Sequence, residues 1–288
     1  MAHEGKEGST HPRTDGGSTA ADGDPGLAET EMMVHDPQTW FETYVGGFYT
    51  GIEKDDRNIS LKETHTRCVR NNMQRLCASL NLEEEDRSIA DLIALFHDIG
   101  RFEQYRTYRT FSDRTSVNHA LLGVRVLARN RVLAGLSFET RRIVLRAIAF
   151  HNAAEIPCTV KGVERLFMQL IRDADKLDIW RVVTDYYHRK DGSPNKTVEL
   201  DLPNTTQWSS NILNALMNRR FARIADMRTL NDFKLLQIGW VFDLNFAESF
   251  RILREQRYIE AIAETLPDHP DIRSAVDTAL DFIADPSG

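Results

Sequence analysis

Side chains that can bind a metal recur on the apolar faces of the helices predicted for this chain. Five short segments each contribute one or two of them: His65, His97, Asp98, His119, His151 and Asp175. A buried His or Asp is costly unless a partner satisfies it, so six such groups turned inward predict one buried polar centre. Imidazole and carboxylate groups bind divalent transition metals, and a metal is the simplest partner that would satisfy all six together.

The spacing around the first of these groups is helical. Ser60 begins a capping-box pattern, so a helix is expected to start there. His65 follows Leu61 by four residues, on the apolar stripe of that helix. His97 lies on the apolar stripe of the next predicted helix, which is expected to end at Gly100 because glycine is common at helix C-termini.

Further helices are expected to carry the remaining groups. They begin at Ser116, near Ser137 and at about Val163, and they carry His119, His151 and Asp175 in that order. Residues 101–115 lack clean periodicity and are expected to form a loop. Pro270 is expected to start the last helix, where a missing backbone N–H costs nothing.

The chain as a whole is predicted to be all-α. Residues 1–34 are rich in Gly, Ser, Thr and Asp and are expected to be a disordered tail. Residues 35–203 are the predicted metal-binding core, and residues 204–288 are a predicted C-terminal helical extension packed on it. A turn is expected at residues 191–194. Residues 197–202 alternate like a strand, so a short β-ribbon is expected there.

Charge and hydropathy argue against several classes of partner. The formal net charge is −7, and residues 1–34 hold seven acidic and two basic side chains, so the rest of the chain is near neutral. No nucleic-acid polymer is therefore expected as a partner. No apolar run is long enough to span a bilayer, and none resembles a signal peptide. The three Cys residues form no framework. A cytoplasmic location without a membrane partner is expected.

The segments that carry these groups resemble the HD superfamily of metal-dependent phosphohydrolases. The family's defining doublet is matched by His97-Asp98 in the sequence His-Asp-Ile-Gly. Its first His is matched by His65, and its final Asp by Asp175 in the sequence Ala-Asp-Lys. The resemblance covers about residues 58–190. It implies an HD-domain helical bundle, with extra C-terminal helices in this chain, in which these four groups bind a divalent ion.

His119 and His151 match additional ligands found in family members with a dinuclear centre. The resemblance therefore implies a cofactor of one or two divalent transition-metal ions, such as Mn, Fe, Co, Ni or Zn. The chain departs from the cyclic-dinucleotide phosphodiesterases of the family, because Asn152 rather than a second His follows His151 and no Gly-Tyr-Pro segment is present.

The activity implied by the resemblance is hydrolysis of a phosphate ester, of a nucleotide or a related small molecule, by a metal-activated water. Asp98 and His97 are the expected catalytic residues. Asp98 would bridge two ions or orient the water.

Three cations next to the motifs are expected to bind this small phosphorylated substrate: Arg101, Arg114 and Lys176. Each also has a structural explanation. The arginines would bond to helix ends or face water, and Lys176 would pair with Asp173 or Asp178. Asp178 lies one helical turn after Asp175, so it would either orient a metal ligand or form a surface pair.

Two other functions remain open for the same ligand set. The HD fold includes diiron oxygenases that use much the same six ligands, and these act on small polar organic substrates. A non-catalytic sensor module stabilised by a metal would also keep the ligands. An oxygenase needs iron and dioxygen, whereas a hydrolase releases phosphate without oxygen.

Overall fold

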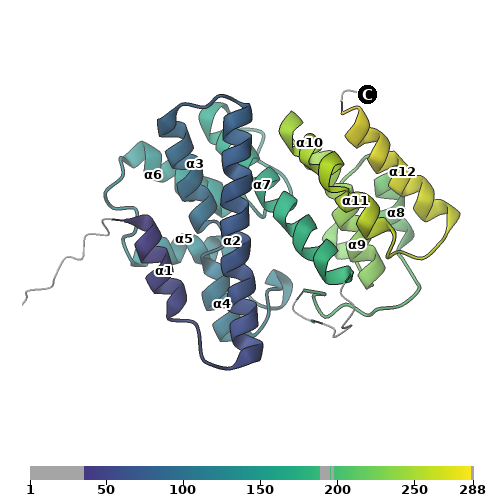
Figure 1. Cartoon of the computed structure of the whole chain (residues 1–288), viewed down its shortest axis with the longest axis horizontal. Coiled ribbons are helices and arrows are strands. Elements are labelled where there is room, and N and C mark those ends of the chain that lie inside the picture. Colours follow the sequence, from purple (N-terminus) through teal and green to yellow (C-terminus); the bar gives the residue numbers. More distant parts are fainter. Residues whose placement is uncertain (1–35, 189–194, 196–197, 287–288) are drawn as a thin grey trace, which may run out of the picture. The chain divides into compact units, whose positions relative to one another are not determined.

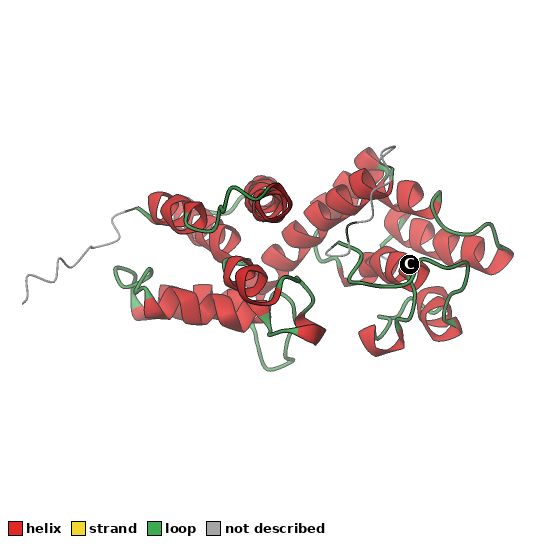
Figure 2. Ribbon diagram, turned by 90° about the horizontal axis from the view of Figure 1, so that it is seen from below, coloured by secondary structure: helices red, strands yellow, loops and turns green. Residues whose placement is uncertain are grey.

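The computed structural model of the protein describes residues 36–188, 195 and 198–286. Within these residues the secondary structure is helical, with no strand (Figure 1, Figure 2). The prediction of an all-α fold is therefore confirmed. The predicted tail at residues 1–34 and the predicted turn at residues 191–194 lie outside the described residues.

The first part of the described chain builds one apolar core. Its helices are α1 (Pro37–Gly46), α2 (Glu53–Ser79), α3 (Glu84–Phe96), α4 (Gly100–Tyr108), the 3-10 helix η1 (Asp113–Thr115), α5 (His119–Arg129), α6 (Phe138–Phe150) and α7 (Gly162–Tyr187). α2 packs along both α3 and α7, and α5 packs against α4 and α6. Met73, Phe96, Phe102 and Phe167 are fully buried between them.

The C-terminal helices surround a second core. They are α8 (Ser210–Met217), η2 (Ile224–Asp226), α9 (Leu230–Gly239), η3 (Trp240–Asp243), α10 (Ala247–Gln256), α11 (Tyr258–Ala263) and α12 (Pro270–Ala284). α12 packs on α8, and α10 and α11 pack on α7. These are the extra C-terminal helices that the sequence predicts. The boundary predicted between residues 203 and 204 stays a prediction.

Helix α7 belongs to both cores. Phe167 and Ile171 lie in the first core, and Trp180 and Val183 lie in the second. The buried Trp180 indole donates a hydrogen bond to the carbonyl oxygen of Gln237 at 3.0 Å. The helix that carries Asp175 is therefore held by the C-terminal helices as well as by the N-terminal ones.

Two local predictions are wrong. Residues 198–201 form a turn rather than a β-ribbon, because Val198 and Glu199 donate locally to the Asn195 carbonyl; Thr197 lies outside the described residues. Residues 101–115 are not a loop, since α4 and η1 occupy most of them. α4 is short and highly charged, and its apolar stripe consists mainly of Phe102 and Tyr105, too little for periodicity to indicate a helix.

Several helix ends also differ from the prediction. α2 begins at Glu53 rather than Ser60, with three acidic side chains in its first turn that favour the helix N-terminus. α5 begins at His119 rather than Ser116, because the Asn118 side chain caps it by accepting from the Leu121 N–H at 3.0 Å. α6 follows its Ser137 cap and α12 begins at Pro270, as predicted.

Gly100 opens α4 instead of closing the preceding helix. A Cβ atom on Gly100 would lie 2.2 Å from the carbonyl oxygen of His119 and 2.6 Å from the backbone nitrogen of Gly123. Glycine is thus required here by the close approach of α4 and α5, and not by a helix cap. This approach brings the His97-Asp98 turn next to the start of α5.

None of the described helices combines the length and the apolar character needed to cross a membrane.

Candidate metal centre

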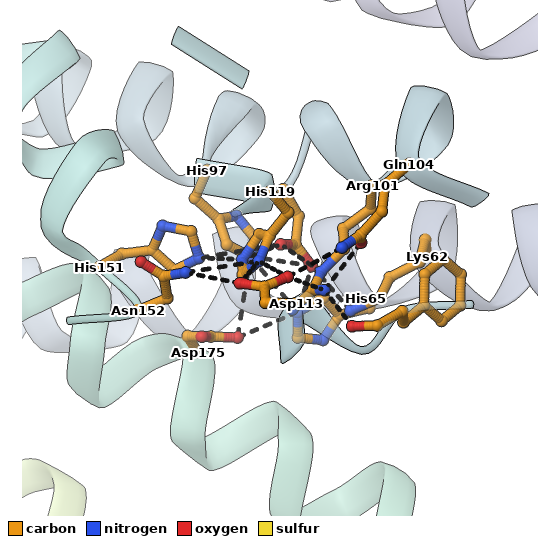
Figure 3. A network of polar contacts seen from close by, with 12 residues as sticks. Lys62, His65, His97, Arg101, Gln104, Asp113, His119, His151, Asn152 and Asp175 are labelled. Atoms are coloured by element: carbon orange, nitrogen blue, oxygen red, sulfur yellow. Dashed lines mark hydrogen bonds and ion pairs between the residues drawn. The ribbon is translucent and has the colours of Figure 1, made fainter. Parts of the chain in front are cut away.

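Five elements bring the six predicted groups together. His65 lies in α2, His97 and Asp98 in the turn after α3, His119 at the start of α5, His151 just after α6, and Asp175 in α7. Figure 3 shows the labelled members converging from these elements. His65, His97, Asp98, His119 and His151 are all buried, with at most 5% of each residue exposed. Asp175 is partly buried.

Two clusters share the Asp98 carboxylate. One consists of His65, His97 and Asp98, and the other of Asp98, His119 and His151. The Oδ2 atom of Asp98 lies 3.5 Å from His65 Nε2 and 3.8 Å from His97 Nε2. Its Oδ1 atom lies 3.3 Å from His119 Nε2 and 3.8 Å from His151 Nε2. Each carboxylate oxygen thus faces one pair of imidazoles.

Asp175 completes the first cluster. Its Oδ1 atom lies 3.0 Å from His65 Nε2 and 3.7 Å from His97 Nε2. Two imidazoles and two carboxylates therefore point at one place, which is a donor set suited to a divalent transition metal.

Every imidazole of the two clusters has an acceptor at its outer nitrogen. His65 Nδ1 faces Asp178 Oδ2 at 2.6 Å, and His119 Nδ1 faces Asp113 Oδ2 at 2.7 Å. The Nδ1 atoms of His97 and His151 each lie 2.8 Å from a backbone carbonyl, of Ala94 and Ile148. These acceptors place the proton on Nδ1, so the lone pair of Nε2 is directed inward.

The inward nitrogens lie in pairs within hydrogen-bonding distance of each other. His97 Nε2 is 3.3 Å from His65 Nε2, and His119 Nε2 is 3.0 Å from His151 Nε2. The lone pairs of the neutral His119 and His151 cannot form a hydrogen bond with each other, whereas a cation between them satisfies both. The buried His and Asp groups of this protein are therefore able to hold metal ions.

The pKa shifts of three imidazoles favour the metal-binding form. Burial, reinforced by Arg101, lowers the pKa of His119 to about 4, and burial together with His97 lowers that of His151 to about 4. Burial also lowers the pKa of His97. These imidazoles are neutral at pH 7, which is the form that coordinates a metal.

The carboxylates are ionised and attract positive charge. Burial alone would raise the pKa of Asp98, but Lys62 and Arg101 outweigh it and hold that pKa well below its usual range. At His65, burial and Lys62 favour the neutral form. The hydrogen bonds to Asp175 and Asp178 nevertheless raise its pKa to about 9. A cation, whether proton or metal, is therefore favoured beside Asp175.

The part of the chain that carries the six groups was compared with models of known protein families. Residues 63–180 match the model of the HD domain. Residues 63–180 of this protein are an HD domain. The match includes all six grouped residues, so the resemblance found in the sequence is confirmed. No protein of curated function and no solved structure was found to be similar to the chain.

The cations predicted to bind substrate lie in three different surroundings. Arg101 reaches the centre of the HD domain, with its Nε atom 3.3 Å from Asp98 Oδ1. Arg114 is exposed in η1. The buried Lys176 donates to Asp243 at 2.6 Å, rather than to Asp173 or Asp178. The substrate-binding role of all three stays a prediction.

Two residues at the centre are not among those predicted from the sequence. Lys62 donates to Asp98 Oδ2 at 2.7 Å; it lies one turn before His65 on α2, but that spacing alone equally fits a solvated lysine. Asp113 accepts from His119, and from Gln104 and Asn152 at 2.8 and 3.0 Å. No helical periodicity links Asp113 to the ligands, because it lies in η1. Asp178 makes contacts of both predicted kinds, since it faces the predicted ligand His65 and also pairs with Arg181 on the same helix.

Proposed function

We propose that this protein is a metal-dependent phosphohydrolase that cleaves the phosphate ester of a nucleotide or a related small molecule. The observation that carries the proposal is the placement of Asp98 in an HD domain, with one carboxylate oxygen facing each imidazole pair. A carboxylate with two oxygens is suited to lie between two cations. Such a pair of cations is a common arrangement for in-line displacement at phosphorus.

The donor sets divide between two positions. His65, His97 and Asp175 would hold one ion, His119 and His151 would hold the other, and Asp98 would contact both. Bound divalent ions would neutralise charge on the phosphoryl oxygens and lower the pKa of a coordinated water toward neutrality. Asp98 and His97 are the proposed catalytic residues, because both would bind an ion at the reacting centre.

The residues around Asp98 have two roles in the proposal. Lys62 and Arg101 keep the Asp98 carboxylate ionised and fix its two oxygens in opposite directions. An ammonium group has three N–H donors, so Lys62 can hold Asp98 and a phosphoryl oxygen at the same time. The Arg101 guanidinium is fixed by Asp113, Gln104 and the Phe111 carbonyl. Arg114, which is exposed beside Asp113, is proposed to meet the outer part of the substrate.

Replacement of Asp98 tests the proposal. Phosphate release from phosphomonoesters and phosphodiesters would be measured without oxygen, with Mn²⁺, Co²⁺ or Ni²⁺ added. Asp98→Ala is expected to lower the rate at least about 100-fold, because both positions lose their common ligand. The matched control is Asp91→Ala on α3, whose carboxylate pairs with Arg70 away from the centre; its rate should stay near that of the wild type.

Two results would contradict the proposal. Full activity of metal-loaded Asp98→Ala protein would remove Asp98 from the reaction. Oxygen uptake by iron-loaded protein, with no phosphate release from any ester, would favour the oxygenase alternative instead.

A further inference from the structure

An ionic contact joins the C-terminal helices to the HD domain beside the candidate metal centre. The carboxylate of Asp243, at the end of η3, lies outside the HD domain. Its Oδ2 atom accepts from Arg172 Nη2 and from Lys176 Nζ, each at 2.6 Å. Both cations are buried on α7, on either side of Asp175. Two buried like charges this close are stable only with a counter-charge, and Asp243 supplies it.

Arg172 extends this contact to the segment that carries His151. Its guanidinium also donates to the carbonyl oxygens of Ala153, of Ala154 at 3.2 Å and of His151 itself at 3.4 Å. These carbonyls follow the last turn of α6. A guanidinium has a planar fork of five N–H donors, so it can fix several carbonyls in one orientation. The position of His151 therefore depends on where Asp243 holds Arg172.

The next residue along α7 strengthens the same connection. The fully buried Asp173 accepts from the Asn245 N–H at 2.9 Å, the Phe246 N–H at 3.2 Å and the Ser249 hydroxyl at 2.7 Å. These donors lie at the start of α10. Residues 245–249 thus hold α7 near Asp175 through hydrogen bonds that do not involve the Asp243 carboxylate, which limits any sliding of α7 there.

All four imidazoles, His151 included through the Ile148 carbonyl, are oriented at Nδ1 from inside the HD domain. His65 is held by Asp178, and His97 by the Ala94 carbonyl. His119 is held by Asp113. Of the two clusters, only the one formed by Asp98, His119 and His151 has an imidazole whose backbone segment accepts hydrogen bonds from Arg172.

We propose that Asp243 is a positioning residue for the ion at Asp98, His119 and His151, acting through Arg172 on His151. The inference rests on the metal centre of the proposed function and adds that the C-terminal helices govern one of its two positions. Asp243 touches neither ion nor substrate. Its loss leaves Arg172 without a counter-charge, so the His151 segment is released while His65 and His97 keep their partners.

The experiment studies each of the two metal positions separately, in the whole chain. His119→Ala leaves the His65–His97 position, and His97→Ala leaves the His119–His151 position. Mn²⁺ alone is titrated into each background, with and without Asp243→Asn. In the His97→Ala background, Asp243→Asn should weaken Mn²⁺ binding roughly 10-fold or more, the usual effect of losing an outer partner of a ligand. In the His119→Ala background the affinity should change less than about twofold.

Two variants separate positioning from general destabilisation. Asp232→Asn removes another buried carboxylate of the C-terminal helices, which accepts from Ser209, Arg228 and Thr229 and not from the HD domain. It should lower thermal stability and leave Mn²⁺ affinity unchanged in both backgrounds. Asp243→Glu, which keeps the charge, should restore most of the affinity that Asp243→Asn loses.

The outcomes distinguish this inference from the proposed function. Unchanged affinity in the His97→Ala background, or equal losses in both backgrounds, would overturn the positioning role and leave the phosphohydrolase proposal intact. A wild-type chain that binds no divalent ion would overturn both. Where Asp243→Asn does not fold, Arg172→Lys carries the test. It keeps the charge next to Asp243 but loses the guanidinium fork, and the same selective loss is expected.

Discussion

Asp178 acts on the candidate centre through a single contact with His65. Its Oδ2 atom lies 2.6 Å from His65 Nδ1, and Arg181 holds its other oxygen at 2.7 Å. A carboxylate in this place fixes the tautomer and the orientation of the imidazole and makes its inward nitrogen a better ligand. Asp178→Ala is expected to lower metal affinity roughly 10- to 100-fold, measured by titration of Mn²⁺ into metal-free protein.

The control for this prediction lies on the same helix. Asp185 also contacts Arg181, at 3.3 Å, but it is exposed and touches no ligand. Asp185→Ala should leave the affinity within about twofold of the wild type. Equal losses in the two variants would mean that Arg181, and not the orientation of His65, explains the effect.

The identity of the individual site residues is the part of the site that the sequence predicts best. The six groups could be named because each His or Asp stands at helical spacing from an apolar neighbour, as His65 does from Leu61. Lys62 and Asp113 were not named. A charged residue on a helix is usually solvated, and only the folded chain shows that Lys62 points at Asp98.

Among the helices, α4 and α5 depend on one glycine for their contact. Gly100→Ala would place a Cβ atom 2.2 Å from a backbone oxygen, which no side-chain rotation can relieve. The two helices would have to move apart, which is expected to lower the free energy of unfolding by about 1–3 kcal/mol, the usual range for overpacking. Thermal or urea unfolding would measure this loss. Because His97-Asp98 and His119 flank the contact, metal affinity should fall as well.

Gly135 provides the matched control for this substitution. No atom lies within 4 Å of a Cβ built on it, and its backbone conformation suits an alanine. Gly135→Ala should change the free energy of unfolding by no more than about 0.5 kcal/mol. A Gly100→Ala protein as stable as this control would show that the two helices can separate without cost.

The sequence predicts the presence of a helix more reliably than the residues at which that helix begins and ends. The long apolar stripes of α2 and α7 were sufficient to predict both. α4 was predicted as a loop, because burial of Phe102 and Tyr105 depends on the helices that cover them. Glycine at position 100 fitted both a helix end and a close helix contact, and the local sequence does not distinguish these.

Across the whole molecule, a bound ion would join five elements that are far apart in sequence. Such an ion stabilises the folded chain because the unfolded chain has no assembled site. At a free metal concentration about 100 times the dissociation constant, the gain is about 2.7 kcal/mol. A chelator should therefore lower the melting temperature by roughly 5–10 °C, measured by calorimetry.

The Asp98→Ala protein serves as the reference for this measurement. Its melting temperature should respond little to the chelator, because the carboxylate common to both clusters is gone. A wild-type protein whose melting temperature is the same with and without chelator would argue against a tightly held ion.

The sequence by itself determined the all-α fold, the HD domain and the six groups of the candidate centre. All of these rest on local periodicity and on short motifs, which are written in consecutive residues. The tertiary structure alone decided that Asp98 divides its oxygens between two imidazole pairs, that Gly100 allows two helices to touch, and that Asp243 pairs with Arg172 and Lys176. Each of these is a contact between segments distant in the chain. Its partner is chosen by packing and by the need to neutralise buried charge, and neither is encoded in the spacing of neighbouring residues.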